Sequence, residues 1–284
     1  MKRVFTIASA FIGIIVGAGF ASGQEILQYF TSFGYMGAFA VALSTVLFAY
    51  LGMTLTTLGS RMKAQSHKRV IYQISGKWLG MIVDAVIVFT LFGVGVVMIA
   101  GAGSNLNQQF GIPHIYGSLL LVVLIIVVGM LNVDKVIAII GSVTPFLIAA
   151  IALVSVYALF TVELPFSELN VIAQQSDSAL PHWALSGINY VSFNIAVGAA
   201  MSLVMGGAEK DEKVARMGGF LGGLGLGVLI FLSYFAILSR IDVVASYELP
   251  MLKLVDMISP VLGVGMSIVL FGMIFNTGLS MFYA

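Results

Sequence analysis

One short string of small and polar residues stands within an otherwise apolar stretch, and its residue types and spacing could support a binding site. It reads Gly17-Ala18-Gly19-Phe20-Ala21-Ser22-Gly23-Gln24, and Glu25 follows it directly. Each glycine weakens a helix by about 1 kcal/mol relative to alanine, so the string favours an interrupted helix. An interruption would free backbone amides and carbonyls, which is tolerated at membrane depth only where they line a cavity. The alternative is that these small residues only allow close helix packing.

Glu25 is the first candidate for a functional charge. An ionisable group at membrane depth is costly, so its presence is a functional hypothesis by default. It could gate, bind substrate or carry a proton, or it could cap the helix that follows the interruption. Asp84 is a second candidate, for which we expect a pairing with a basic loop residue such as Lys77. A role for Asp84 in proton relay is the alternative.

A second cluster of small and polar residues runs from Gly187 to Gly198 and includes Phe193, Asn194 and Ala196. Paired interrupted helices that enter from opposite faces are typical of the central site of a transporter. Amides near Ala21 to Gln24 would then meet a carboxylate, and carbonyls near Phe193 to Ala196 would meet an ammonium. The two clusters together predict a site for an α-amino acid.

Oxygen-bearing side chains also occur in the last apolar run, as Asn276, Thr277 and Ser280. Such oxygens suit a hard cation such as Na⁺. The alternative is that the hydroxyl groups bond to the backbone of their own helix.

These residues lie in a chain whose composition is that of a membrane protein. Of its 284 residues 60 % are apolar and only 9 % are charged, and the formal net charge is +1. A soluble domain has about 45–50 % apolar and about 25 % charged residues, so a soluble enzyme, a nucleic-acid binder and a disordered scaffold are excluded. The absence of cysteine excludes disulfides and thiolate chemistry.

The apolar runs are long and continuous, which predicts helices rather than the short alternating strands of a membrane barrel. We expect an all-α, polytopic membrane protein with eight transmembrane helices. Their predicted ranges are 4–31, 36–59, 78–104, 115–132, 136–162, 182–207, 217–239 and 259–284.

The basic residues predict the orientation in the membrane. With the N-terminus inside, eleven of the 13 Lys and Arg residues lie on the cytoplasmic face, as the positive-inside rule expects. The loop from Glu163 to Pro181 has no basic residue and is expected outside. The localisation implied is the cytoplasmic membrane of a cell, with a cytoplasmic N-terminus.

The string from Gly17 to Glu25 resembles that of the bacterial YkvI-type membrane proteins. The helix order resembles the amino acid, polyamine and organocation superfamily, whose members have the leucine-transporter fold. That resemblance implies an inverted core of five plus five helices, with helices 1 and 6 interrupted. Residues 1–284 would form one transmembrane domain, with 1–162 the first repeat and 182–284 part of the second, cut short at Ala284.

The resemblance implies a secondary transporter of an amino acid or similar small zwitterion, which works by alternating access. It also implies that Thr277 and Ser280 share a sodium ion with backbone carbonyls near Ile14 to Gly17. Proton-coupled members of the superfamily often have a lysine of helix 5 in place of this ion, and helix 5 of this chain has no basic residue. The alternatives are a proton-coupled carrier and a nutrient sensor that does not transport. We expect no enzymatic activity and no cofactor other than sodium as the coupling ion. The partners expected are an amino-acid-like small molecule and the lipid bilayer, with no nucleic acid.

Overall fold

A computed structural model describes residues 1–65, 67–130, 149–158 and 160–283, and every element in these ranges is a helix. The first part contains α1 (Lys2–Ile15), α2 (Ala18–Ser22), α3 (Gln24–Tyr29) and the short 3₁₀ helix η1 (Thr31–Phe33). The middle part contains α4 (Met36–Met62), α5 (His67–Phe110), α6 (His114–Gly129) and α8 (Phe166–Ala173). The last part contains α9 (Trp183–Ala208), α10 (Glu212–Ser239), α11 (Ile241–Val244), α12 (Pro250–Ile258) and α13 (Pro260–Tyr283).

Five helices within these ranges are long and apolar enough to cross a membrane. They span Met36–Met62, Val70–Phe110, Trp183–Ala208, Glu212–Ser239 and Pro260–Leu279. Two shorter apolar helices, His114–Gly129 and Ala149–Ala158, accompany them. The all-α prediction is confirmed for the described residues, whereas the eight-helix count stays a prediction. The first predicted span is divided into short helices, and much of the fifth lies outside the described residues.

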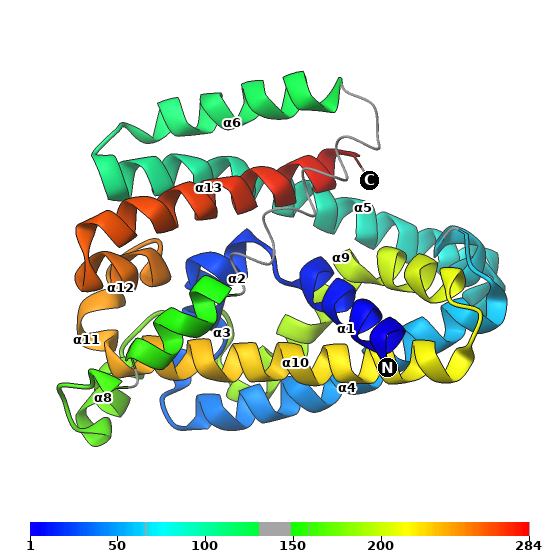
Figure 1. Cartoon of the computed structure of the whole chain (residues 1–284), viewed down its shortest axis with the longest axis horizontal. Helices are drawn as coiled ribbons and strands as arrows, with labels where there is room; N and C mark the ends of the chain where they lie inside the picture. The colour runs from blue at the N-terminus through cyan, green and yellow to red at the C-terminus, as the bar shows by residue number, and fades with distance from the viewer. Residues whose placement is uncertain (66, 131–148, 159, 284) are drawn as a thin grey trace. The chain divides into compact units, whose positions relative to one another are not determined.

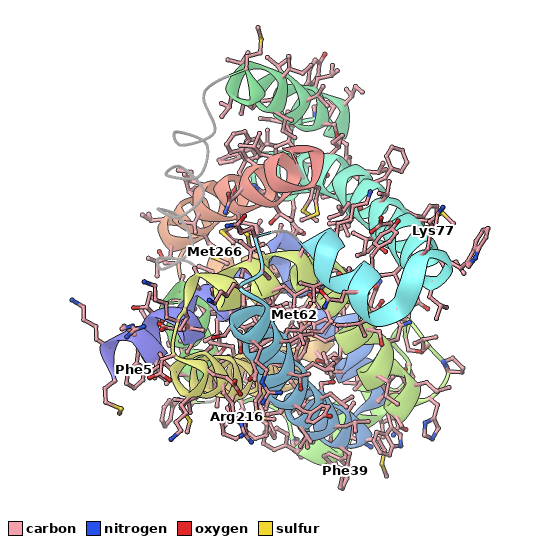
Figure 2. All side chains as sticks on the ribbon, turned by 90° about the vertical axis from the view of Figure 1, so that its right-hand side faces the viewer. Phe5, Phe39, Met62, Lys77, Arg216 and Met266 are labelled. Carbon is pink, nitrogen blue, oxygen red and sulfur yellow. The ribbon has the colours of Figure 1, made fainter. Side chains whose placement is uncertain are left out.

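The spanning helices carry large apolar side chains on their outer faces. Phe39 on α4 is 59 % exposed, and Trp78 and Phe89 on α5 are 77 % and 78 % exposed. Figure 2 shows Phe39 directed away from the ribbon. In water such surfaces would favour aggregation, but in a bilayer they contact lipid chains.

The chain divides into two compact units, and each takes segments from both halves of the sequence. Unit 1 is made of Met1–Val16, Phe39–Leu91 and Ala184–Ile230. Unit 2 is made of Gly17–Ala38, Phe92–Trp183 and Phe231–Ala284. The predicted division into two inverted repeats stays a prediction.

Unit 1 is a bundle in which α1, α4, α9 and α10 approach closely at glycines. A Cβ atom added to Gly222 of α10 would lie 2.9 Å from Cβ of Phe11 on α1. A Cβ atom added to Gly206 of α9 would lie 2.8 Å from Cα of Thr56 on α4. The hydroxyl of Thr56 donates a hydrogen bond of 2.8 Å to the carbonyl of Ala215 on α10. The small residues of these helices therefore serve close packing, as in other membrane bundles.

Ion pairs gather at one end of unit 1, where α1 begins, α4 ends and α9 is joined to α10. The Arg3 guanidinium donates to both carboxylate oxygens of Glu209, whose side chain is only 8 % exposed. Arg61 pairs with Glu212 at 2.7 Å. The structure therefore brings to one end of unit 1 basic residues that the topology prediction assigns to one side of the membrane.

Replacing Arg3 by glutamine is expected to destabilise unit 1, because the buried Glu209 carboxylate loses both guanidinium donors and keeps the amide of Asp211. Hydrogen bonds to charged groups contribute about 1.5–3 kcal/mol. The melting temperature of the protein in detergent should fall for Arg3→Gln. The same change at the neighbouring exposed Lys2 is the control and should leave it unchanged, and equal melting temperatures for both variants would contradict this role.

Unit 2 is built around α13, which lies alongside α6 and packs against α12 and α2 (Figure 1). Its join to α5 is polar and buried: Asn105 donates to the Ser267 carbonyl at 2.9 Å, and the Ser267 hydroxyl donates to Asn105 at 3.1 Å. The Gln108 side chain exchanges two hydrogen bonds with the backbone of Leu249, at 3.0 and 2.9 Å. These contacts fix the segment that leads into α12.

The loop predicted to lie outside contains a helix, α8, that sequence analysis did not identify. Asn170 on α8 accepts a hydrogen bond of 2.8 Å from the Tyr35 amide. The amide of Ala179 donates to the Gln28 carbonyl at 3.0 Å, so the loop is held against the end of α3. Helix α8 begins directly after Pro165 and carries Glu168 in its first turn, where an acidic residue is typical of a helix start.

Candidate functional site

The predicted interruption of the first helix is present in the structure. Helix α1 ends at Ile15, Val16 is extended with φ −72° and ψ 91°, and Gly17 is extended with φ −100° and ψ −172°. Helix α2 begins at Ala18 and lasts only five residues. Because the first amides and last carbonyls of a helix have no partner within it, this break supplies backbone polar groups within an apolar segment. Val16 is the last residue of the first segment of unit 1, and Gly17 is the first residue of unit 2.

A second break follows at Gly23, which separates α2 from α3. Its φ of 82° lies in the left-handed region that side chains other than glycine rarely adopt. A Cβ atom there would lie 2.8 Å from Cγ of Met251 and 3.1 Å from its backbone nitrogen. Gly23 is therefore required both by the backbone turn and by the close approach of α12.

Glu25 folds back across this second break onto α2. Its Oε1 atom occupies the place where a Cβ of Gly19 would stand, and its Cδ lies 2.6 Å from that place. Ser22 supports the turn, since its hydroxyl donates to the Gly19 carbonyl at 2.8 Å and accepts from the Gln24 amide at 3.2 Å. Glu25 also stands in the first turn of α3, where a carboxylate is favourable. The geometry thus joins the carboxylate to the glycine string.

Thr277 on α13 contacts the first break. Its Oγ1 accepts a hydrogen bond of 3.3 Å from the amide of Ala18, and it lies 3.4 Å from the position of a Cβ on Gly17. The hydroxyl therefore satisfies the first amide of α2. Asn276, the next predicted ligand, is 6 % exposed, and the side chain of Ser280 lies outside the described part of the structure. Sodium binding by these residues stays a prediction.

The predicted interruption of the sixth helix is wrong. Helix α9 runs without a break from Trp183 to Ala208, through Phe193, Asn194 and Ala196. Its polar side chains bond to their own helix: Asn194 donates to the Tyr190 carbonyl at 2.9 Å, and Ser202 donates to the Gly198 carbonyl at 2.8 Å. These side chains thus meet their hydrogen-bonding needs without unwinding the backbone. The carbonyls expected to bind an ammonium are consequently part of a regular helix.

Asp84 lies in unit 1, on α5. It accepts a hydrogen bond of 3.0 Å from the Tyr72 hydroxyl and pairs with Lys68 at 3.5 Å. The predicted pairing with a basic residue is therefore present, but the partner is Lys68 rather than Lys77. A kink at Gly76, with φ 71° and ψ 179°, lies between Tyr72 and Asp84.

Met251 is a residue of the site that sequence analysis missed. It comes from α12, more than two hundred residues after Gly23, yet it fills the space beside that glycine. The available signal was the dipeptide Leu249-Pro250, because proline at the first position of a helix is a typical start signal. That signal locates α12 along the chain but does not identify what it packs against.

Comparisons with known proteins support the membrane assignment. No family model and no solved structure matches the chain. It is 29 % identical over 282 residues to the uncharacterized membrane protein YkvI of Bacillus subtilis, and the aligned region covers 98 % of this chain and 78 % of YkvI. It is 26 % identical over 245 residues to the uncharacterized protein YyaD of the same organism, and the aligned region covers 86 % of this chain and 69 % of YyaD. The chain is thus a multi-pass membrane protein that is similar over nearly its whole length to another bacterial membrane protein.

Proposed function

We propose that this protein is a secondary transporter of an amino acid or similar small zwitterion, which works by alternating access and is coupled to sodium. The observation that carries the proposal is the doubly broken first helix, with Glu25 folded onto Gly19 and Thr277 at the start of α2. Broken helices of this kind supply the backbone groups that bind substrates and ions in secondary transporters. The resemblance to the leucine-transporter fold belongs to the same proposal. The continuous α9 leaves that resemblance dependent on the first helix alone.

The charges at the break support the proposed substrate class. Glu25 is half-buried and reaches back to Gly19 instead of extending away from the helix. A carboxylate in this position is a partner for a substrate ammonium, in place of the α9 carbonyls. The amides of Ala18, Ala21, Gly23 and Gln24 already donate to acceptors of the chain. The donors for a substrate carboxylate are therefore the amides of Gly19 and Phe20 in the first turn of α2. An α-amino acid carries both of these groups.

The position of Thr277 supports sodium as the proposed coupling ion. Its oxygen lies beside the extended backbone of Gly17, and hydroxyl and carbonyl oxygens together suit a hard cation. A proton-coupled carrier is the second candidate, and the specific observation that favours it is the position of Glu25, because that carboxylate could carry the proton.

Replacing Glu25 by glutamine distinguishes these roles. If the carboxylate binds the ammonium, the substrate concentration for half-maximal transport should rise by about tenfold or more, in both uptake and exchange, as expected for loss of a charged hydrogen-bond partner. The measurement is the uptake and exchange of labelled amino acid by proteoliposomes. Loss of gradient-driven uptake with intact exchange would instead identify Glu25 as the proton carrier. Unchanged kinetics would mean that Glu25 only caps the start of α3.

We further propose that the protein lies in the cytoplasmic membrane with its N-terminus inside. The chain has no cysteine, so a single cysteine at Gln65 or at Gln175 gives an unambiguous label, and both positions are exposed. An impermeant thiol reagent applied to intact cells should label position 175 and should label position 65 only after permeabilisation. The reverse pattern would contradict the orientation.

A nutrient sensor that binds the amino acid without moving it is the competing function. A sensor and a carrier would share the binding site, so a binding measurement cannot separate them. Exchange of labelled amino acid across a vesicle membrane occurs only with a carrier, and it therefore decides between the two.

A further inference from the structure

A cavity away from the broken helix has the features of a separate binding site. It measures about 260 Å³ and lies within unit 2, between the helix Ala149–Ala158, the end of α10 and the helix α12. That volume corresponds to about nine water molecules at roughly 30 Å³ each, so it would hold a small molecule. Its lining residues are Val154, Tyr157, Ala158, Thr161, Glu163, Arg240, Leu254, Met257 and Ile258.

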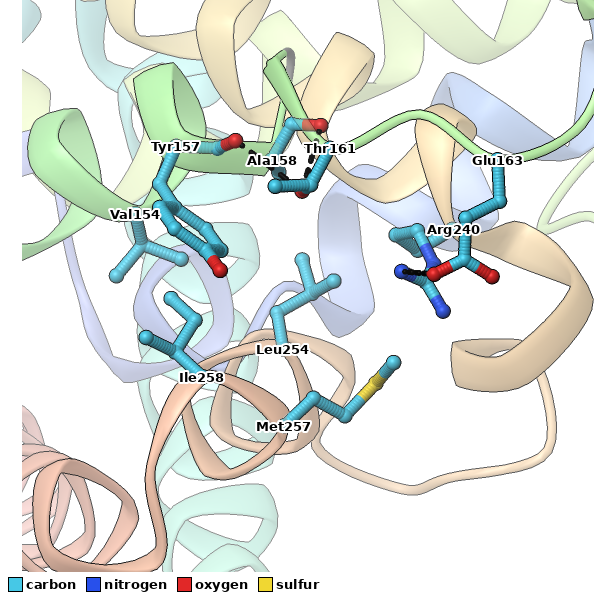
Figure 3. A pocket seen from close by; sticks show the side chains of 9 residues that line it. All are labelled: Val154, Tyr157, Ala158, Thr161, Glu163, Arg240, Leu254, Met257 and Ile258. Atoms are coloured by element: carbon cyan, nitrogen blue, oxygen red, sulfur yellow. Dashed lines mark hydrogen bonds and ion pairs between the residues drawn. The ribbon is translucent and has the colours of Figure 1, made fainter.

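The cavity has one charged end and one mainly apolar end, to which Tyr157 adds a hydroxyl (Figure 3). Arg240 and Glu163 form an ion pair of 2.9 Å at the charged end. Val154 and Ile258 lie at the other end, and Leu254 and Met257 of α12 lie between them. A ligand that matches this lining has an ionic head and a short aliphatic body.

The charge of the head follows from the two members of the ion pair. The Arg240 side chain is 13 % exposed, whereas that of Glu163 is 68 % exposed. Arg240 donates to Glu163 through Nη1, and its second terminal nitrogen, Nη2, donates to no acceptor within the described residues. A guanidinium has five donors and no acceptor, so the Arg240 donors that Glu163 does not use are suited to an anionic ligand.

We propose that this cavity binds a small aliphatic carboxylate, whose carboxylate replaces Glu163 on Arg240. A carboxylate accepts two parallel hydrogen bonds from a guanidinium edge, so the ligand uses the two terminal nitrogens, Nη1 and Nη2. Glu163 is exposed, so its released side chain returns to solvent at little cost. The aliphatic body packs against Leu254, Met257 and Ile258. This site does not depend on the proposed transport function.

Isocaproate is the probe, and its neutral isostere isocaproamide is the matched control. Calorimetric titration of the purified protein in detergent should detect isocaproate and should detect isocaproamide at least tenfold more weakly. Arg240→Gln should weaken isocaproate binding by more than about tenfold, as expected for loss of a charged donor. Glu163→Gln should tighten it by up to about fivefold, because an exposed competitor is removed.

A second pair of variants leaves the ion pair intact. Met257 is 37 % exposed, so polar side chains are tolerated there. Met257→Glu brings a like charge to the cavity and should abolish isocaproate binding, whereas Met257→Gln should retain it. Both variants should elute and melt as the parent protein does in the absence of ligand.

Three results would overturn the proposal. Equal binding of isocaproate and isocaproamide would exclude the guanidinium as the partner. Unchanged binding to Arg240→Gln and to Met257→Glu would exclude the cavity. Loss of isocaproate binding in Gly19→Leu together with its retention in Met257→Glu would assign the anion to the broken helix, whereas failure of transport alone leaves the cavity site unaffected.

Discussion

Replacing Gly19 by leucine is expected to abolish amino acid binding while the protein still inserts into the membrane. The Cβ of any side chain at this position would take the place of the Glu25 carboxylate, whose Cδ lies 2.6 Å away. The carboxylate must then leave α2, and the leucine fills the gap in the broken helix. Calorimetry with purified protein should show no heat of amino acid binding.

The matched control is Gly265→Leu. Gly265 lies in α13, and nothing stands within 4 Å of the position of its Cβ. This variant should bind amino acid as the parent protein does. Normal binding by Gly19→Leu would mean that the glycine string serves helix packing alone, and the transport proposal would lose its main support.

Replacing Thr277 by valine is expected to raise the sodium concentration for half-maximal uptake by about tenfold or more. Valine nearly preserves the volume but removes the hydroxyl beside Gly17, and a polar contact to a charged group contributes about 1.5–3 kcal/mol. The measurement is the initial rate of amino acid uptake by proteoliposomes across a series of sodium concentrations.

Thr277→Ser is the control for this change, because Thr277 also accepts the hydrogen bond of the Ala18 amide. Serine keeps that hydroxyl, so its sodium dependence should stay close to that of the parent protein. If both variants respond to sodium as the parent does, the ion binds elsewhere. Uptake that needs no sodium at all would refute the assignment of a sodium site to α13.

The break in the first helix was predictable because its cause is local. Gly17, Gly19 and Gly23 lower helix propensity within a few residues, and the left-handed turn at Gly23 is one that glycine favours. The long apolar helices were predictable for the same reason, since continuous hydrophobicity requires only a bilayer. Both features depend on neighbouring residues alone.

The interruption of α9 was predicted wrongly because one sequence pattern has two structural outcomes. Serine and asparagine within a helix either mark a break or bond to a carbonyl four residues earlier. In α9, Asn194 and Ser202 do the latter. The choice depends on tertiary packing, such as the close approach of Gly206 to Thr56, which the sequence alone does not reveal.

The residues around the break were only partly predictable. Thr277 was identified by its oxygen in an apolar run, but Met251 offered no chemical signal and reaches Gly23 only through the folding of α12. Asp84 was expected to pair with a basic residue, yet the partner is Lys68, on the far side of the kink at Gly76. Partners that depend on such turns require a structure.

Gradient-driven uptake is the decisive test of whether this protein transports amino acids. The purified protein is reconstituted into proteoliposomes, and the accumulation of a labelled amino acid pool is followed with an inward sodium gradient and with choline in its place. We expect accumulation above the external concentration. This accumulation should require sodium, and Gly19→Leu should abolish it. Binding of an amino acid without uptake or exchange, in either buffer, would contradict this expectation and would identify the protein as a sensor.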